Sequence, residues 1–280
     1  MNSSPATLPI KDWLHSATKQ LESAAVGSAR LDVLVLLEDE LHKDRAWLLA
    51  HPDFALNRSQ VKDLNTKITQ RSNHIPLAYI RGKAAFYGRE FFVSNSVLQP
   101  RPESETIIEI LLKLPAIHSK PYAIADVGTG SGALGITAAL ELPGCSVVLL
   151  EIDASACKVA QKNVVNYSLS LPVLKSDLLE AAPQAYDILL CNLPYVPDDF
   201  HINTAAGHEP RLAIFGGNDG LDLYRRLFDQ LQKIPKKPLY ILCESLPFQH
   251  SELAHIAEAK GYKLQETNDF VQLFTNNLAA

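Results

Sequence analysis

From residue 104 onward, short apolar runs alternate with helical patterns. The runs are "YAIADVG", "CSVVLLEID", "PVLKSD", "YDILLCN" and "PLYILCES", and most of them end in a polar or acidic residue. This alternation predicts a mostly parallel sheet with helices on both faces. The final stretch, "GYKLQETNDFVQLFTNN", holds two strand patterns with only a short break, so these two strands should pair antiparallel. The expected fold is therefore an α/β, Rossmann-like sheet with one reversed strand.

The residues before this sheet follow two other patterns. Between residues 10 and 71, apolar residues recur at spacings of three and four, as in "RLDVLVLLEDELH", which is typical of amphipathic helices. Aromatic and β-branched residues around "YGRE" predict a β-hairpin instead. We expect a small all-α domain over residues 1–75, a hairpin connector over 76–102 and the sheet domain over 103–280. The all-α part holds no glycine-rich loop or catalytic cluster, which favours partner binding.

Composition and charge exclude several classes of protein. A formal net charge of -5 argues against stable nucleic-acid binding, which usually needs a basic surplus. The four cysteines form no short pair and the histidines have no ligand-like pairing, so neither a disulfide framework nor a metal site is expected. There is no signal-peptide pattern and no apolar run of membrane-spanning length. We expect a cytoplasmic protein without membrane association.

A glycine-rich stretch, "DVGTGSGALG", follows the first strand of the sheet domain and opens a helix. Gly128, Gly130 and Gly132 let the backbone turn tightly and approach a ligand closely. Glu151 ends the next strand, where an acid can bind ribose hydroxyls. These features predict a nucleoside-containing cofactor, either NAD or S-adenosylmethionine. Asp126 favours the second, because a carboxylate before the glycines can help to hold the ammonium group of a methionine moiety.

A second unusual segment, "CNLPYV", follows the apolar run "YDILL". The Asn192 side-chain oxygen and the Leu193 main-chain carbonyl can each accept one N–H hydrogen bond. Pro194 restricts the backbone that aims this carbonyl, and Tyr195 offers a flat face for a planar amide or base. The carboxyl ends of parallel strands share one crevice, so this turn should face the cofactor. We interpret it as a site that orients a planar amino group toward an electrophilic methyl group.

Four motifs together carry a resemblance to a known family: "DVGTGSG", "NLPY", "QPRPESE" and "HEPRLAIFGGNDGLDLYR". From about Leu31 to its C-terminus, the chain resembles the HemK/PrmC-like glutamine methyltransferases of peptide chain release factors. The resemblance implies a class I methyltransferase sheet behind a helical domain that helps to grip the release factor. It also implies methyl transfer from S-adenosylmethionine to the side-chain amide nitrogen of the glutamine in a Gly-Gly-Gln loop.

Carried onto this sequence, the resemblance assigns roles to individual residues. The residues expected to bind the cofactor are Gly128, Thr129, Gly130, Ser131, Gly132, Glu151, Asp177, Leu178 and Asn192. The residues expected to hold the substrate amide are Asn192, Leu193, Pro194 and Tyr195, and Asn192, Pro194 and Tyr195 are the expected catalytic residues. Arg101, Glu103, Glu209 and Arg211 match further family motifs near the cleft.

Two segments depart from the family's usual pattern. The turn is usually Asn-Pro-Pro-Tyr, whereas Leu193 takes the second place here, as in ribosomal RNA adenine dimethyltransferases. The main-chain carbonyl survives this change. In addition, "CESLPFQ" replaces Glu-x-Gly-x-x-Gln and loses the glycine after Glu244. We expect this second change to alter the shape of the far wall of the cleft.

Three alternatives to this function stay open. An adenine amino-group methyltransferase acting on RNA or DNA needs the same amide-accepting turn. A nicotinamide-dependent dehydrogenase explains the glycine loop and Glu151 but leaves "NLPY" without a task. A non-catalytic binding module that kept the fold is supported only by the two departures.

Overall fold

The computed structural model describes residues 8–115, 117–181, 185–202 and 204–276. The chain divides into two compact units. The first comprises Met1–Gly82 and Asn203–His208, and the second comprises Lys83–Ile202 and Glu209–Ala280. The domain boundaries expected from the sequence, after residues 75 and 102, stay predictions.

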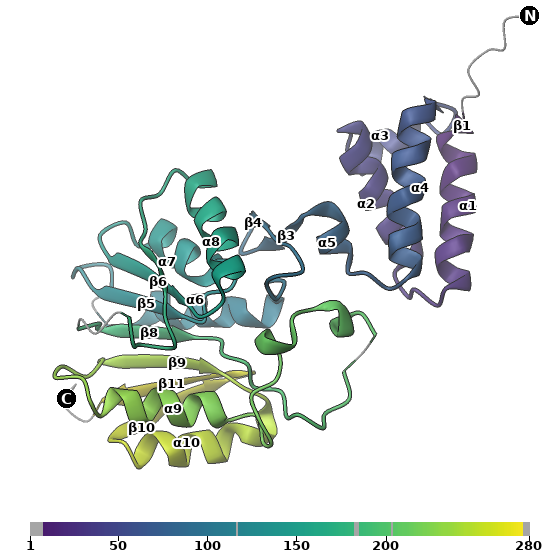
Figure 1. Cartoon of the computed structure of the whole chain (residues 1–280). Coiled ribbons are helices and arrows are strands. Elements are labelled where there is room, and N and C mark those ends of the chain that lie inside the picture. Colours follow the sequence, from purple (N-terminus) through teal and green to yellow (C-terminus); the bar gives the residue numbers. More distant parts are fainter. Residues whose placement is uncertain (1–7, 116, 182–184, 203, 277–280) are drawn as a thin grey trace, which may run out of the picture. The chain divides into compact units, whose positions relative to one another are not determined.

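The first unit is built from helices around an apolar core. Its helices are α1 (Ile10–Ser23), α2 (Ala29–Leu41), α3 (Arg45–Ala50), α4 (Arg58–Ser72) and α5 (Leu77–Arg81), and the two-residue strands β1 (Leu8–Pro9) and β2 (Ala55–Leu56) pair antiparallel. α1, α2 and α4 pack on one another (Figure 1). Trp13 is buried and its indole N–H donates to Asn65 Oδ1 at 2.8 Å. The helical pattern expected for residues 10–71 is therefore confirmed.

The second unit holds a seven-stranded sheet in the order β10-β11-β9-β8-β5-β6-β7 (Figure 1). Its strands are β5 (Ala123–Val127), β6 (Ser146–Glu151), β7 (Val173–Lys175), β8 (Ile188–Cys191), β9 (Tyr240–Glu244), β10 (Tyr262–Asn268) and β11 (Val271–Asn276). β5 pairs parallel with β6 and with β8, whereas β11 pairs antiparallel with both β9 and β10. The mostly parallel sheet with one reversed strand is thus confirmed.

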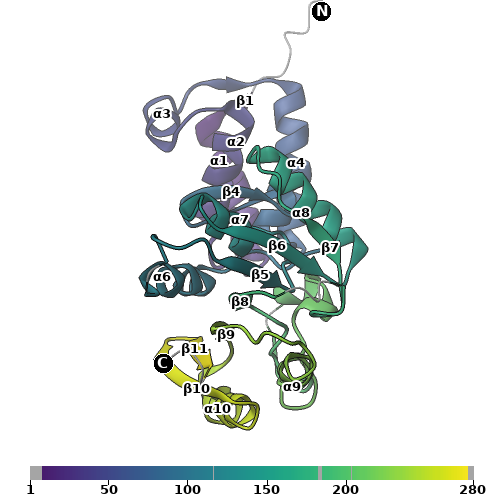
Figure 2. The same cartoon turned by 90° about the vertical axis from the view of Figure 1, so that its left-hand side faces the viewer.

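Helices cover the two faces of this sheet, as the alternating sequence pattern predicts (Figure 2). The helices α6 (Glu105–Lys113), α7 (Ala133–Glu141) and α8 (Ala154–Asn166) share one apolar core with one face. The helices α9 (Asp222–Leu231) and α10 (His250–Glu258) share a second core with the other face. Successive residues of the central strands alternate between these cores, because side chains of a strand point to opposite faces. Among the described residues, no helix combines the length and apolar character that a membrane crossing requires.

A β-hairpin precedes the sheet, where the sequence predicts one. Its strands are β3 (Lys83–Phe86) and β4 (Arg89–Phe92), joined at Tyr87-Gly88. Asn163 of α8 fixes the hairpin, since its Oδ1 accepts from Phe92 N at 2.7 Å and its Nδ2 donates to Phe92 O at 2.9 Å. The same Nδ2 donates to Ser131 O at 2.8 Å. One buried amide therefore ties the hairpin, α8 and the glycine loop together.

Candidate functional site

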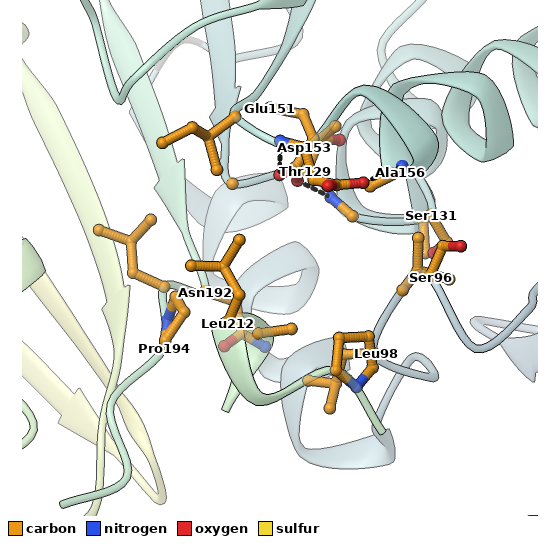
Figure 3. Close-up of a pocket in the computed structure, with 18 of the residues that line it drawn as sticks. Ser96, Leu98, Thr129, Ser131, Glu151, Asp153, Ala156, Asn192, Pro194 and Leu212 are labelled. Atoms are coloured by element: carbon orange, nitrogen blue, oxygen red, sulfur yellow. Dashed lines mark hydrogen bonds between the residues drawn. The ribbon is translucent and has the colours of Figure 1, made fainter. Parts of the chain in front are cut away.

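A cavity of about 420 Å³ lies at the carboxyl ends of the parallel strands. The glycine loop after β5, the ends of β6, β7 and β8, the segment 95–101 and part of α9 line it. Figure 3 shows Glu151 and Asp153 beside the glycine-loop residue Thr129, and Asn192 with Pro194 at another part of the wall. The sequence-predicted cofactor loop and reactive turn therefore meet at one cavity.

The glycine loop requires glycine at specific positions. Gly128, Gly130 and Gly132 have φ values of 72°, 54° and 85°, in the left-handed region that side chains disfavour. A Cβ on Gly128 would lie 2.9 Å from Leu193 Cδ2, so the loop and the reactive turn touch at this point. Gly128, Thr129, Gly130 and Ser131 line the cavity, whereas Gly132 does not belong to its described lining.

Glu151 lines the cavity and also supports the loop. Its side chain is 8% exposed; Oε2 accepts from Gly130 N at 2.9 Å and Oε1 accepts from Asp153 N at 3.0 Å (Figure 3). Each carboxylate oxygen has a second acceptor position left. The residue can therefore hold the loop and accept hydrogen bonds from a ligand at the same time.

From the sequence we expected the Asp126 carboxylate to help to hold an ammonium group. Asp126 is not among the residues that line the cavity. It is fully buried, and its Oδ2 accepts hydrogen bonds from Thr129 Oγ1 and from Gly135 N at 2.8 Å. Burial raises the pKa of Asp126 to about 6, although the hydrogen bonds from Thr129 and Gly135 oppose this shift. Asp126 thus supports the glycine loop, and its expected contact with an ammonium group stays a prediction.

A second part of the wall follows β7. Ser176, Asp177 and Leu178 line the cavity, and Leu178 is 7% exposed. Leu178 has a φ of 52°, which is uncommon for a large side chain. Arg226 of α9 also lines the cavity and donates to Asp177 Oδ2 at 2.6 Å. This turn presents one carboxylate and one apolar side chain to a ligand.

The reactive turn follows β8, and Asn192, Leu193 and Pro194 line the cavity. Asn192 Nδ2 donates to Ser104 Oγ at 2.7 Å. Since the amide nitrogen is engaged in this way, the amide oxygen is the end that can accept an N–H from a substrate. Leu193 is 2% exposed and packs in the core beside Gly128. Leucine therefore fills buried space in the place where the family usually has proline.

Tyr195 is held behind the turn and does not belong to the described lining of the cavity. Its hydroxyl donates to Glu244 Oε1 at 2.9 Å. Burial, followed by the charge of Glu244, raises the pKa of the Tyr195 phenol, which keeps it protonated. Its expected role as a stacking face stays a prediction.

Buried groups from β9 and its following segment fix the turn. Gln249 Nε2 donates to Tyr195 O at 2.8 Å and to Asp219 O at 2.7 Å. A Cβ on Gly220 would lie 2.0 Å from Tyr195 O, so the backbone packs closely there. Burial raises the pKa of Glu244, with opposing hydrogen bonds from Ser104, Tyr195 and Asn192. Glu244 is thus a buried acid that contacts the turn without lining the cavity.

The lost glycine in "CESLPFQ" has a simple structural explanation. Leu246 stands in that place with φ -69° and ψ 144°, an extended conformation that any residue adopts. Its N–H donates to Gln249 Oε1 at 2.8 Å. The backbone of this wall therefore does not require glycine at position 246.

The four charged residues that match further family motifs lie in different places. Arg101 lines the cavity and donates to Glu209, whose side chain is 1% exposed. Burial raises the pKa of Glu209, while the charge of Arg101 lowers it. Glu103 is exposed in the short 3-10 helix Pro102–Ser104. Arg211 is exposed and stacks over the Phe215 ring at 4.1 Å from its centroid.

Several residues at or beside the site have roles that the sequence analysis did not assign, although some of them lie within the motifs "QPRPESE" and "CESLPFQ". The segment 95–101 forms a wall of the cavity, Ser104 orients Asn192, and Gln249 holds the turn. The prolines of "QPRPESE" mark a connector in the sequence, but they do not show that it returns to the cavity. No group of three or more metal-ligating side chains is found in the described parts of the chain.

Family models match both parts of the chain. The PrmC N-terminal domain matches residues 12–82, and the Methyltransferase small domain matches residues 105–209. Among solved structures, the hMettl16 catalytic domain in complex with MAT2A 3'UTR hairpin 6 is 18% identical with a TM-score of 0.55. It covers 84% of this chain and 92% of its own, and the likeness concerns the fold alone.

Two relatives that match over most of their length show the family of this chain. The release factor glutamine methyltransferase of Koribacter versatilis (strain Ellin345) is 36% identical over 242 residues, which are 85% of this chain and 86% of the relative. That of Coxiella burnetii (strain RSA 493 / Nine Mile phase I) is 33% identical over 260 residues, or 91% and 92% of the two chains. A dehydrogenase, which the glycine loop alone left open, does not account for these matches. The chain belongs to the release factor glutamine methyltransferase family.

Proposed function

We propose that this chain transfers a methyl group from S-adenosylmethionine to the side-chain amide nitrogen of the glutamine in the Gly-Gly-Gln loop of peptide chain release factors. Family membership supports this reaction. The single observation that carries it is the Asn192–Pro194 turn, which lines the same cavity as the glycine loop. An amide-accepting turn beside a nucleoside-binding loop is the arrangement that methylation of a planar nitrogen requires.

The residues around the cavity fit S-adenosylmethionine. No atom lies within 4 Å of the place where a Cβ on Gly130 would stand, and Glu151 has acceptor positions for ribose hydroxyls. Asp177 can accept from the adenine amine, and Leu178 offers an apolar contact to the ring. When bound, S-adenosylmethionine supplies an electrophilic methyl group. We therefore retain Glu151, Asp177 and Leu178 as cofactor-binding residues in this proposal.

The reactive turn holds the glutamine amide in this mechanism. The Asn192 oxygen and the Leu193 carbonyl each accept one N–H of the planar amide. This grip fixes the nitrogen and aims it at the methyl group in a near-attack geometry. Ser104 holds the Asn192 amide, and Gln249 holds the turn at the Tyr195 carbonyl. The amide proton leaves after the transfer, so the step needs no strong general base in the cavity.

The partner in this proposal is a release factor rather than a nucleic acid. The expected all-α domain over residues 1–75 contributes grip on the whole protein substrate. The net charge of -5 gives no general attraction to phosphates. Ribosomal RNA is therefore the informative competing substrate, since the Asn-Leu-Pro-Tyr form also resembles adenine methyltransferases.

Replacement of Asn192 by alanine tests the proposed reaction. At saturating cofactor, Asn192→Ala should lower the rate of labelled methyl transfer to a purified release factor on the order of a hundredfold, because a positioning hydrogen bond is lost. A release factor whose Gly-Gly-Gln glutamine is changed to alanine is the substrate control. It should accept no label from the unaltered enzyme.

Two results would contradict the proposal. Labelling of ribosomal RNA in preference to the release factor would assign the site to adenine amino groups. Near-normal transfer by Asn192→Ala, with the variant folded by circular dichroism, would show that the turn does not hold the amide.

A further inference from the structure

Two side chains on one face of α9 reach the turn that follows β7. Arg226 and Gln230 are four residues apart, which places them on the same side of a helix. Arg226 donates to the Asp177 carboxylate at 2.6 Å. Gln230 Oε1 accepts from Leu179 N at 2.8 Å, and its Nε2 donates to Asp177 O at 3.3 Å. The helix therefore contacts both the side chain and the backbone of this turn.

The turn needs such support because its backbone is held in an uncommon conformation. Leu178 has a φ of 52°, a strained conformation for a non-glycine residue that persists only where the surrounding structure holds it. Ser176 Oγ donates to Leu178 O at 2.8 Å and accepts from Ala181 N at 2.9 Å. These bonds close the turn internally, while Gln230 ties it to the rest of the fold.

α9 is a firm anchor for the turn. Leu227, Phe228 and Leu231 are fully buried in the core beneath the sheet. At the other end of the helix, the Tyr224 hydroxyl donates to Cys191 O at 3.1 Å and contacts Glu244 O. The same helix thus contacts the end of β8, from which the reactive turn starts, and the turn after β7.

We propose that Arg226 and Gln230 are positioning residues, which hold Asp177 and Leu178 in the arrangement that receives the adenosine end of the cofactor. The inference rests on the proposed function. In it, Arg226 orients the carboxylate by occupying Oδ2, and Gln230 fixes the backbone on both sides of Leu178. Neither residue takes part in methyl transfer itself.

Two variants, one at Gln230 in α9 and one at Gln232 at the C-terminal end of the helix, distinguish the proposed positioning role from an effect on general stability. Gln230→Met keeps the length of the side chain but removes both hydrogen bonds to the turn. Gln232→Met is the matched control, because Gln232 is exposed and its Nε2 donates to Lys260 O at 2.9 Å, away from the cavity. Calorimetry with S-adenosylhomocysteine measures the affinity of each whole protein. Gln230→Met should bind about three- to tenfold more weakly, and Gln232→Met should match the unaltered chain.

The KM for the cofactor, compared with the KM for the release factor and with kcat, gives a readout that a merely structural role would not change selectively. For Gln230→Met, the KM for S-adenosylmethionine should rise while the KM for the release factor and kcat stay close to those of the unaltered chain. Arg226→Gln should show the same pattern, and its surface position makes misfolding a smaller concern. Thermal unfolding of each variant checks that the fold is kept.

The possible outcomes distinguish this inference from the proposed function. If the unaltered chain does not bind S-adenosylhomocysteine, the proposed function fails. If the unaltered chain binds it and both Gln230→Met and Arg226→Gln bind equally well, the positioning role is wrong. An equal loss of affinity in Gln230→Met and Gln232→Met would also overturn the role, because the effect would then come from the helix as a whole.

Discussion

At the scale of single residues, Asp126 is a motif residue whose carboxylate stabilises the glycine loop. Its carboxylate accepts from Thr129 and Gly135 inside the glycine loop, and a Cβ on Gly135 would lie 2.9 Å from it. Its Oδ1 is buried without a hydrogen-bond partner. Burial therefore outweighs the two hydrogen bonds and raises the pKa to about 6.

This raised pKa predicts a pH dependence of stability. Because the folded state holds the proton more tightly than the unfolded state, the contribution of Asp126 is complete below its ordinary pKa of 3.8 and is lost as pH rises through about 6. Asp126→Asn lacks this titration. Relative to the variant, the unaltered chain should lose about 2 kcal/mol of unfolding free energy between about pH 4 and pH 7. Urea unfolding across this range measures the difference, and parallel pH profiles of the two proteins would refute the prediction.

At the scale of elements, Asn163 joins three segments that are distant in the sequence. It is fully buried in α8 and bonds β4 of the hairpin and the glycine loop. Lys162, its neighbour, covers the Phe92 ring at 3.7 Å from the centroid. The cavity wall at the glycine loop therefore depends on a helix that contributes few side chains to the cavity.

Removal of this amide should destabilise the second unit. Asn163→Ala leaves Phe92 N–H, Phe92 C=O and Ser131 C=O without their buried partner, which should lower the free energy of unfolding by about 2–4 kcal/mol. Asn166→Ala is the control, since Asn166 is exposed at the end of the same helix. Chemical denaturation of both variants gives the comparison. Equal, small changes in the free energy of unfolding of the two variants would show that the hydrogen bonds of Asn163 do not stabilise the unit.

At the scale of the whole molecule, the family models match both units separately. The described lining of the cavity lies entirely in the second unit, so the first unit contributes no residue to it. Leu49 and Phe54 are 55% and 43% exposed on the first unit, and Phe54 contacts the Trp47 ring edge to face. These exposed apolar side chains are available for contact with a protein partner.

Recognition of the whole release factor should therefore depend on this surface. Leu49→Ser with Phe54→Ser should lower kcat/KM for an intact release factor by about three- to tenfold, because apolar contact area is lost. Transfer to a short Gly-Gly-Gln peptide, which reaches only the cavity, should stay unchanged and is the control. The rates are measured by methyl incorporation. A matching loss on both substrates would place the defect in the catalytic unit instead.

The sequence by itself determined the alternation of strands and helices along the chain, the hairpin and the identity of the two loops at the cavity. These follow from local patterns: apolar runs, the glycines of "DVGTGSG" and the Asn-Leu-Pro-Tyr sequence of the turn. Parallel strands then bring the carboxyl ends of β5, β6, β7 and β8 to one edge, so convergence of the motifs is a consequence of topology. The fold prediction and the family resemblance are confirmed, while the individual site roles stay predictions.

Only the tertiary structure decided which side chains face the cavity and which support it. The Asp126 carboxylate is buried and accepts from Gly135 N, and the Tyr195 hydroxyl donates to Glu244, which is 49 residues away in the sequence. Asn163 and Gln230 act through contacts across 71 and 51 residues. Such partners depend on how distant elements pack, and a single polar residue on a helix carries no local signal of the group that it will bind.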